Sequence, residues 1–495
     1  MSNCLPGINC TSQKITARRL PQDYAANPLL MIARYLPALL AIAVLHPVFA
    51  AERQPNVILI LADDLGYQDL SCYGHPSIRT PVLDRLASEG VRLTDFHSGA
   101  TVCTPSRMAL LTGAYPTRLG WTRGVCGHLM GMHDGMSTEA LTIAEIFKSE
   151  GYSTAISGKW HLGDQPDTLP NQQGFDSTYY LSHSNNQSKE IWRANEVVEN
   201  PFDNRKLTEK FTAEAIRFVR EHKDKPFFLY LPYTAPHFPV QPHPDWKGRS
   251  KFGDYGDVVE ELDSRIGDLL ATLKDLAIDK DTIFIFTSDN GPNPKEKSSP
   301  LPFRGEKWSA LEGGTRVPCI VVWPGVIPAG QVNSNLISAM DLLPSLCHAS
   351  GIDLGAKTSG KPKIDGLDVW DTLLGKTHGH PRNELLYWHG MSPEPQAFRS
   401  GDSKLFFDRS NAFQGAGTER ATTEQLSKIA PIRAGLTPGV NPPILFNLRE
   451  DPGETTDQGG ASPDELKALQ LRATALITEL KADSILPLST SEKKN

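Results

Sequence analysis

The chain has 495 residues, enough for one large α/β domain with a smaller unit or for two to three ordinary domains. Hydrophobic residues make up 39% and charged residues 22% of the sequence, which is typical of a globular protein, and the net charge is −7. This balance, with no long basic run, argues against a nucleic-acid-binding protein.

The N-terminal segment predicts export. Arg34 precedes a mostly apolar stretch, 36–45, that is too short to span a bilayer, and residues 48–50 fit a small-residue cleavage site. We therefore expect a leader, 1–50, with its true start at Met31 and cleavage after Ala50. A membrane anchor is the competing interpretation. Export would make the protein periplasmic or secreted, without stable membrane insertion.

The number of cysteines left after cleavage is odd. Cys4 and Cys10 belong to the leader, and five cysteines remain. An odd cysteine in an exported protein points to a reactive or modified thiol. The pairing of the others, Cys72, Cys126, Cys319 and Cys347, cannot be read from their spacing.

Strand-like and helix-like segments alternate up to about residue 350. Such alternation predicts a mostly parallel sheet with helices on both faces. The predicted strands are 56–62, 153–157, 227–233, 282–288 and 319–323, and the predicted helices are 78–90, a helix after residue 103, 139–150, 208–222 and 255–276.

The pattern changes in the C-terminal part. Short antiparallel strands are expected in 384–389, 398–408 and 444–448, followed by a helix from Ser462 to about Lys481. Segment 409–443 has little helical or strand periodicity and is predicted to be a long loop or an insertion. We thus expect a catalytic α/β domain at 51–380, a smaller α+β subdomain with an antiparallel sheet and a helix at 381–487, and a mobile tail at 488–495.

Polar side chains follow four of the predicted strands. Ligands bind outside the carboxyl ends of the strands in open α/β sheets, so these side chains are expected to face one rim. Each alone has a second interpretation as an ordinary turn residue. They are Asp63, Asp64, Lys159, His161, His237, Asp289 and Asn290.

The residue types at this rim favour one kind of chemistry. The aspartates and Asn290 form an all-oxygen set, which selects Ca²⁺ or Mg²⁺ over zinc. Arg107, Lys159 and Lys307 are candidate anion clamps, and His161 and His237 are candidate proton carriers. Together they suit the transfer of a tetrahedral oxyanion, sulfuryl or phosphoryl.

Cys103 has two interpretations. Thr104 and Pro105 indicate a helix start, so Cys103 is expected just outside a helix N-terminus, where the dipole favours thiolates and oxyanions. Taken alone, a buried structural cysteine is the simpler interpretation. The rim residues, which a structural cysteine does not need, favour a nucleophile.

Several sequence blocks resemble the type I, formylglycine-dependent sulfatases of the alkaline phosphatase superfamily. The resemblance covers about residues 55–485 and implies an alkaline-phosphatase-like fold. Its signature is Cys103-Thr104-Pro105-Ser106-Arg107 with Leu111-Thr112-Gly113, and the other blocks are 62–66, 158–163, 235–237, 288–291, 304–307 with 312–318, and 448–454. The family usually has Arg after the Thr-Gly pair, where this chain has Ala114.

The resemblance implies a mechanism. Cys103 would be oxidised to formylglycine (3-oxoalanine) by a formylglycine-generating maturation enzyme before export, and its hydrate would be the nucleophile. Asp63, Asp64, Asp289 and Asn290, with position 103, would ligate Ca²⁺. Asp289 would help to deprotonate the nucleophile, and His237 with Lys307 would protonate the leaving oxygen. His161 would take a proton from the second hydroxyl. Arg107 and Lys159 would hold the sulfate.

The expected activity is hydrolysis of sulfate esters, by resemblance those of sulfated carbohydrates. The alternatives are a phosphodiesterase or phosphonate monoester hydrolase with the same nucleophile, and a non-catalytic carbohydrate-binding relative. Because specificity in such enzymes lies in loops, we also name candidate substrate-binding residues. They are His183, Asn185, Trp192, Arg193 and His243, with segment 409–443 as a further candidate.

Overall fold

The structure is a computed structural model. It describes residues 54–127, 134–377, 379–390, 392–413, 422–434 and 441–485. The predicted leader, its cleavage site and the predicted tail at 488–495 lie outside these residues. Within the described part of the chain, no helix has both the length and the apolar character needed to cross a membrane.

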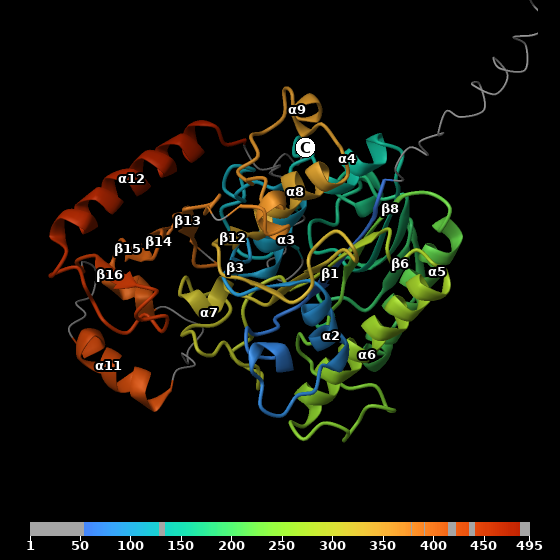
Figure 1. The fold of residues 1–495 in the computed structure, drawn as a ribbon, viewed down its shortest axis with the longest axis horizontal. Coiled ribbons are helices and arrows are strands. Elements are labelled where there is room, and N and C mark those ends of the chain that lie inside the picture. The colour runs from blue at the N-terminus through green and yellow to red at the C-terminus, as the bar shows by residue number, and fades with distance from the viewer. Residues whose placement is uncertain are drawn as a thin grey trace, which may run out of the picture. The chain divides into compact units, whose positions relative to one another are not determined.

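A ten-stranded sheet forms the centre of the fold (Figure 1). Its order is β11-β2-β10-β9-β1-β8-β4-β5-β6-β7, and the central run from β9 to β5 is parallel. The strands are β1 (Asn56–Ala62), β2 (Val91–Leu93), β4 (Ser153–Lys159), β5 (Ser177–Leu181), β6 (Ile191–Arg193), β7 (Glu196–Glu199), β8 (Phe227–Pro232), β9 (Thr282–Ser288), β10 (Cys319–Val322) and β11 (Gln331–Asn333).

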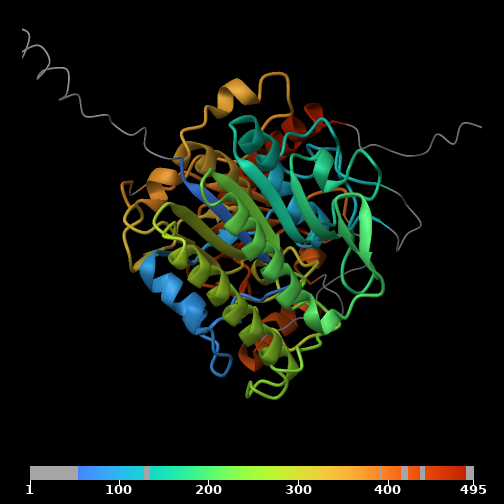
Figure 2. The ribbon, with the colours of Figure 1, turned by 90° about the vertical axis from the view of Figure 1, so that its right-hand side faces the viewer.

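Helices cover both faces of this sheet, as the alternating sequence predicts. Along β1, Val57, Leu59 and Leu61 point into one apolar core and Ile58 and Ile60 into the other. The first core includes α3 (Cys103–Thr112), α4 (Ile143–Ser149), α8 (Leu342–Ala349) and α10 (Trp370–Leu373), near the short pair β3 (Phe96–His97) and β12 (Ile337–Ser338). The second includes α2 (Pro81–Glu89), α5 (Leu207–His222) and α6 (Asp254–Asp275), which cross the sheet in Figure 2.

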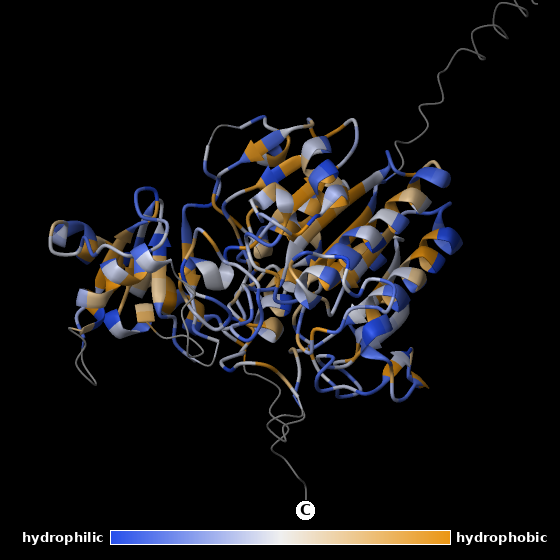
Figure 3. Ribbon diagram, turned by 90° about the horizontal axis from the view of Figure 1, so that it is seen from below, coloured by the Kyte–Doolittle hydropathy of each residue, from blue (hydrophilic) through white to orange (hydrophobic). Residues whose placement is uncertain are grey.

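Apolar strands therefore lie between amphipathic helices. Figure 3 shows hydrophobic strands inside and hydrophilic residues on the outer sides of the helices. A continuous apolar run such as 56–62 is stable only in this position, because both faces of the strand are buried. The mixed α/β fold with a large, mostly parallel sheet is confirmed.

A small antiparallel sheet follows, as the C-terminal sequence predicts. Its order is β13-β14-β15-β16, and α12 packs on it through Leu469 and Ala473. The elements are β13 (Glu384–Tyr387), β14 (Ala397–Ser400), β15 (Ser403–Phe406), β16 (Ile444–Asn447) and α12 (Pro463–Ala482). The domain boundary at 380 stays a prediction.

The described part of the patternless segment 409–443 includes an α-helix that the sequence does not predict, α11 (Thr423–Ala434). Its apolar residues do not form a continuous stripe, and of its described residues only Ile429 is buried. Two further short helices, α7 (Glu312–Thr315) and α9 (Leu354–Lys357), complete the described α-helices.

A buried charge network joins the small sheet to the large one. Lys404 of β15 lies 2.9 Å from a carboxylate oxygen of Glu312 in α7 and 2.9 Å from one of Glu454, and all three side chains are fully buried. Arg399 of β14 pairs with Asp95 at 2.7 Å. Because α7 follows the loop that carries Lys307, this network connects the small sheet with the predicted catalytic rim.

Candidate active site

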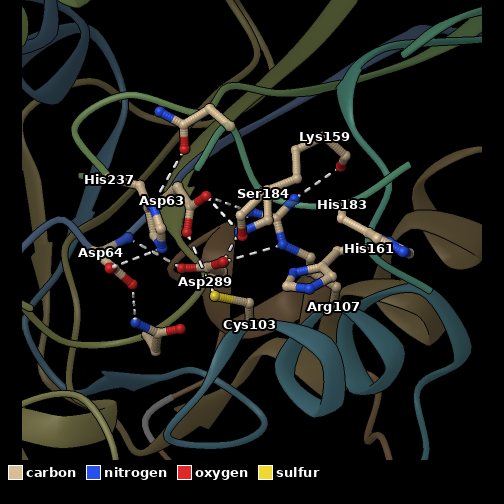
Figure 4. A network of polar contacts seen from close by, with 12 residues as sticks. Asp63, Asp64, Cys103, Arg107, Lys159, His161, His183, Ser184, His237 and Asp289 are labelled. Atoms are coloured by element: carbon tan, nitrogen blue, oxygen red, sulfur yellow. Dashed lines mark hydrogen bonds and ion pairs between the residues drawn. The ribbon is translucent and has the colours of Figure 1, made fainter. Parts of the chain in front are cut away.

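The carboxyl ends of four neighbouring parallel strands meet at one edge of the large sheet, where Figure 4 shows the polar cluster. β1 leads into Asp63 and Asp64, β4 ends at Lys159, and β9 leads into Asp289. In β4, Gly158 has φ +141°, and a Cβ there would lie 1.9 Å from the carbonyl oxygen of Pro232 in the neighbouring β8. Only glycine permits this approach of the two strands, which sets the position of Lys159.

Cys103 lies at the N-terminus of α3 and points into the same cluster. It is the first residue of the helix, with Val102 as the N-cap, whereas the sequence predicts it just outside. The helix ends at Gly113, whose φ of +67° suits glycine. The Sγ atom lies 3.5 Å from Oδ1 of Asp63 and 3.2 Å from Nζ of Lys307, so residues from three distant segments converge on it.

Three carboxylates in the cluster pair with three cations. Lys159 Nζ lies 2.6 Å from Asp63 Oδ2, and Lys307 Nζ lies 2.6 Å from Asp64 Oδ1. Arg107 donates to Asp289 Oδ2 from Nε at 3.0 Å and from Nη2 at 2.8 Å. All six side chains are buried, so these charges balance one another away from water. The six are Asp63, Asp64, Asp289, Arg107, Lys159 and Lys307.

Burial controls the protonation of two groups in this cluster. It raises the pKa of the Cys103 thiol to about 12 despite the nearby ammonium groups of Lys159 and Lys307. Burial thus opposes ionisation of this thiol more strongly than the two ammonium groups favour it. Burial, followed by the carboxylate of Asp63, raises the pKa of Asp289 to about 6.

Four buried side chains of the cluster could hold a metal ion. Asp63, Asp64, Cys103 and His237 each offer a ligand atom within 4.8 Å of the others. Asn290 donates from Nδ2 to Asp64 Oδ1 at 2.7 Å, and its buried Oδ1 has no hydrogen-bond partner. An unpartnered buried oxygen beside carboxylates is what a Ca²⁺ or Mg²⁺ site offers.

The two predicted proton carriers also lie in this region. Both ring nitrogens of the buried His161 lack a hydrogen-bond partner, and burial together with the charge of Lys159 holds its pKa well below the ordinary value. His161 is therefore a neutral imidazole with a free lone pair near neutral pH. Burial also lowers the pKa of His237 to about 3, although its Nε2 lies 3.6 Å from Asp64 Oδ2.

The backbone is strained at three places beside the cluster. Asp64 has φ +65°, His161 has φ +58° and Trp308 has φ +82°. Such conformations cost about 1–3 kcal/mol each for residues other than glycine, and they occur preferentially at functional sites. Here the backbone conformations of Asp64 and His161 set the directions of their side chains, and the strained Trp308 directly follows Lys307.

A cavity of about 350 Å³ opens over Cys103. His161, His237 and Lys307 contribute to its wall, so the nucleophile candidate and the proton carriers face the same space. The remaining lining residues are Val125, Ser184, Asn186, Gln187, Phe238, Asn293, Pro294, Lys295 and Trp308.

Two of the predicted substrate-binding residues lie close to this cluster. The His183 ring lies 5.9 Å from that of His161, centroid to centroid. Asn185 contacts the imidazole of His237, with Oδ1 3.1 Å from Nδ1. Neither is among the residues that line the cavity over Cys103.

The other three predicted substrate-binding residues lie elsewhere and do not line the cavity. Trp192 and Arg193 belong to β6, and Arg193 pairs with Glu214 at 2.6 Å. His243 follows β8, and its Nε2 lies 3.4 Å from Glu209. Arg193 and His243 thus pair with neighbouring acidic side chains outside the cavity.

Sequence reasoning missed several residues of the site. Asn293 donates to Asp64 Oδ2 at 3.0 Å, and Phe238, Lys295 and Trp308 line the cavity. A usable signal was sequence proximity, because Phe238 and Trp308 directly follow predicted catalytic residues and Asn293 lies three residues after Asn290.

Comparison with known proteins identifies the family. The profile of the Sulfatase family matches residues 55–352. Human arylsulfatase A is 35% identical over 461 residues, covering 85% of this chain and 87% of its own length. The rat (Rattus norvegicus) N-acetylgalactosamine-6-sulfatase is 37% identical over 468 residues, covering 85% and 84%.

Solved structures agree with this assignment. The PsFucS1 sulfatase from Pseudoalteromonas sp. superposes with a TM-score of 0.75 at 26% identity, covering 93% of this chain and 96% of the other. A structure titled Ps i-CgsB in complex with k-i-k-neocarrahexaose gives a TM-score of 0.70 at 27% identity, covering 89% and 96%. The converging carboxylates, cations and histidines thus lie in a chain that belongs to the sulfatase family, and the protein is a sulfatase that hydrolyses sulfate esters.

Proposed function

We propose that Cys103 is converted to formylglycine and that the hydrate of this residue hydrolyses sulfate esters of a carbohydrate. The observation that carries the proposal is the position of Cys103. Its Sγ lies 3.2 Å from Lys307 Nζ, in the cavity that His161 and His237 also line. A thiol with a pKa of about 12 is a poor nucleophile near neutral pH, whereas a hydroxyl at this position has a base and cations around it.

The charges of the site favour an anionic substrate. Three carboxylates face three cationic side chains, so the cluster is close to neutral by itself. A bound Ca²⁺ or Mg²⁺ would add positive charge beside Asp63, Asp64, Asp289 and Asn290. Arg107 and Lys159 would then orient the oxygens of the substrate sulfate and of position 103, and they would stabilise the charge that develops during transfer.

The residues can be assigned to three proton transfers. The hydrate supplies two hydroxyl groups on one carbon, the first to attack sulfur and the second to allow sulfate to leave. Asp289 takes the proton of the first hydroxyl. Lys307 and His237 deliver a proton to the alcohol oxygen as its bond to sulfur breaks. His161 takes the proton of the second hydroxyl as the C–O bond to sulfate breaks, which restores the aldehyde for rehydration by water.

The protonation states in the structure support these roles. His161 is neutral and its ring nitrogens are free, as a base requires. Lys307 is protonated, because the carboxylate of Asp64 raises its pKa against the opposing effect of burial. His237 is neutral without substrate, and an anionic sulfate ester in the cavity would favour its protonated form.

A carbohydrate fits the cavity wall. Ser184, Asn186 and Gln187 line one part, and the aromatic residues Phe238 and Trp308 line another. Hydroxyl and amide groups with aromatic surfaces suit the hydroxyls and apolar faces of a sugar. One relative is named for an N-acetylgalactosamine sulfate, and one related structure contains neocarrahexaose.

Mass spectrometry of the peptide containing Cys103 tests the modification directly. After production with a formylglycine-generating enzyme and export, the peptide should have lost sulfur and gained an aldehyde oxygen. Sulfate release from sugars sulfated at defined positions then tests the substrate. Cys103→Ala should abolish release and Cys72→Ala should retain it, while retained turnover in Cys103→Ala would refute the proposed nucleophile.

A further inference from the structure

Two asparagines form a hydrogen-bonded chain behind His237. The Nδ1 atom of His237 lies 2.7 Å from the carbonyl oxygen of Phe238 and 3.1 Å from Oδ1 of Asn185. Asn185 Nδ2 donates to Asn204 Oδ1 at 2.8 Å, and Asn204 Nδ2 donates to the carbonyl oxygen of Pro239 at 3.0 Å. Asn185 is buried and does not line the cavity over Cys103.

The direction of this chain follows from its last member. A backbone carbonyl can only accept, so the amide nitrogen of Asn204 must face Pro239. This leaves Asn204 Oδ1 to accept from the amide nitrogen of Asn185. The oxygen of Asn185 is therefore the atom that faces His237. The carbonyl of Pro239 thus fixes the orientation of both side-chain amide groups.

His237 must consequently carry its proton on Nδ1. Both atoms that face Nδ1, the carbonyl oxygen of Phe238 and Oδ1 of Asn185, are acceptors. The other ring nitrogen, Nε2, faces Asp64 at 3.6 Å. If the Asn185 amide were turned around, its nitrogen would face Nδ1 and would favour the opposite tautomer.

We propose that Asn185 and Asn204 are positioning residues that hold His237 in the Nδ1–H tautomer and fix its ring. Nε2 is then the nitrogen available for proton exchange with the substrate. The kinetic part of this proposal rests on the proposed function of His237, whereas the tautomer does not. Asn185 acts through His237 and does not bind the substrate.

Nuclear magnetic resonance can measure the tautomer in the full-length protein labelled with ¹⁵N in its histidines. The His237 signals are assigned by their loss in His237→Gln. We expect the Nδ1–H pattern in the wild type and in Asn185→Asp, which retains an acceptor. We expect an increased Nε2–H population in Asn185→Leu, which removes one of the two acceptors at Nδ1 and leaves the carbonyl oxygen of Phe238. An Nε2–H pattern in the wild type, or an unchanged tautomer in Asn185→Leu, overturns the proposal.

Kinetics distinguishes positioning from substrate binding. Asn185→Leu should lower kcat about 10–100-fold on an alkyl sulfate, whose alcohol needs a proton to leave. It should lower kcat less on 4-nitrophenyl sulfate and leave KM unchanged. Asn204→Leu should act in the same direction, and Asn185→Asp should recover most of the kcat. Asn195→Ala, in an exposed amide pair with Asn171, is the matched control and should match the wild type.

The opposite changes in kcat and KM would overturn the proposal. A raised KM with unchanged kcat in Asn185→Leu would mean that Asn185 binds the substrate. Failure of the proposed function is detected separately. If Cys103→Ala kept sulfate ester hydrolysis, the proposed nucleophile would be wrong, and the ¹⁵N measurement would still decide the tautomer of His237.

Discussion

The ammonium nitrogen of Lys307 lies 3.2 Å from Sγ of Cys103, although 204 residues separate the two along the chain. Lys307 comes from the loop that precedes α7, and Cys103 begins α3. The same ammonium group lies 2.6 Å from Asp64. Lys307 thus connects the proposed nucleophile position with the candidate cation site.

Lys307→Met should lower kcat about 10²–10⁴-fold, because a proton donor to the leaving oxygen is lost. The loss should be larger for alkyl sulfates than for aryl sulfates, since a phenolate leaves without protonation more readily. Steady-state kinetics on both substrates measures the difference. Lys251→Met, at an exposed position, is the control, and equal losses on both substrates would contradict the assigned role.

His161→Gln should stop the second half of the reaction. The variant lacks the base for the second hydroxyl, so it should release one equivalent of alcohol per enzyme and retain the sulfate on the protein. Rapid-quench kinetics and the mass of the intact protein measure both quantities. The exposed His348→Gln should turn over normally, whereas a His161→Gln enzyme that releases alcohol and sulfate together would argue against this role.

Removal of divalent cations should abolish activity and leave the fold intact. The carboxylates of the cluster keep their cationic partners Lys159, Lys307 and Arg107. Loss of the metal ion therefore does not leave these buried charges unpaired. Added Ca²⁺ or Mg²⁺ should restore turnover and raise the thermal midpoint, with about 2.7 kcal/mol of stabilisation at a concentration of about 100 Kd. Full activity in protein shown to be free of divalent metals would contradict the prediction.

Glu261 should make the stability of the protein depend on pH. Burial raises the pKa of this α6 carboxyl from 4.5 to about 7, against the opposing effect of Arg265, whose Nε lies 3.6 Å from its Oε1. Below the unfolded pKa both states are protonated. Between the two pKa values only the folded state keeps the proton, so the free energy of unfolding falls as pH rises, by up to about 3 kcal/mol.

Glu261→Gln removes this titration. Its unfolding free energy should exceed that of the wild type at about pH 8, where wild-type Glu261 is ionised in both states, and should match it at about pH 4. Urea unfolding at both pH values measures the effect. The exposed Glu196→Gln should follow the wild type, and an equal change at both pH values would show that Glu261 does not titrate as described.

Lys404→Met should destabilise the fold by about 3–5 kcal/mol, because it leaves Glu312 and Glu454 buried without their common cation. Thermal and denaturant unfolding measure this loss. Lys428→Met breaks a Lys–Glu pair of the same length, 2.9 Å, on the exposed face of α11. The control should unfold like the wild type, and equal stability of both variants would argue against the network.

Much of this protein could be predicted from local sequence. Apolar runs such as 56–62 and 282–288 determined the buried strands, and the polar residues after them, Asp63, Asp64 and Asp289, marked the rim of the sheet. These predictions succeed because strand burial and helix amphipathicity are periodic properties of neighbouring residues. The family blocks then singled out Cys103, one of four buried cysteines in the described residues, as the expected nucleophile.

Only the tertiary structure decided which side chains meet. The sequence could not show that the acceptor facing His237 is Asn185, or that Arg193 pairs with Glu214 instead of lining the cavity. Nor could local rules show that burial outweighs the charges of Lys159 and Lys307 at the Cys103 thiol. These outcomes depend on strand order and on desolvation by residues far along the chain, and a periodic pattern carries no information about either.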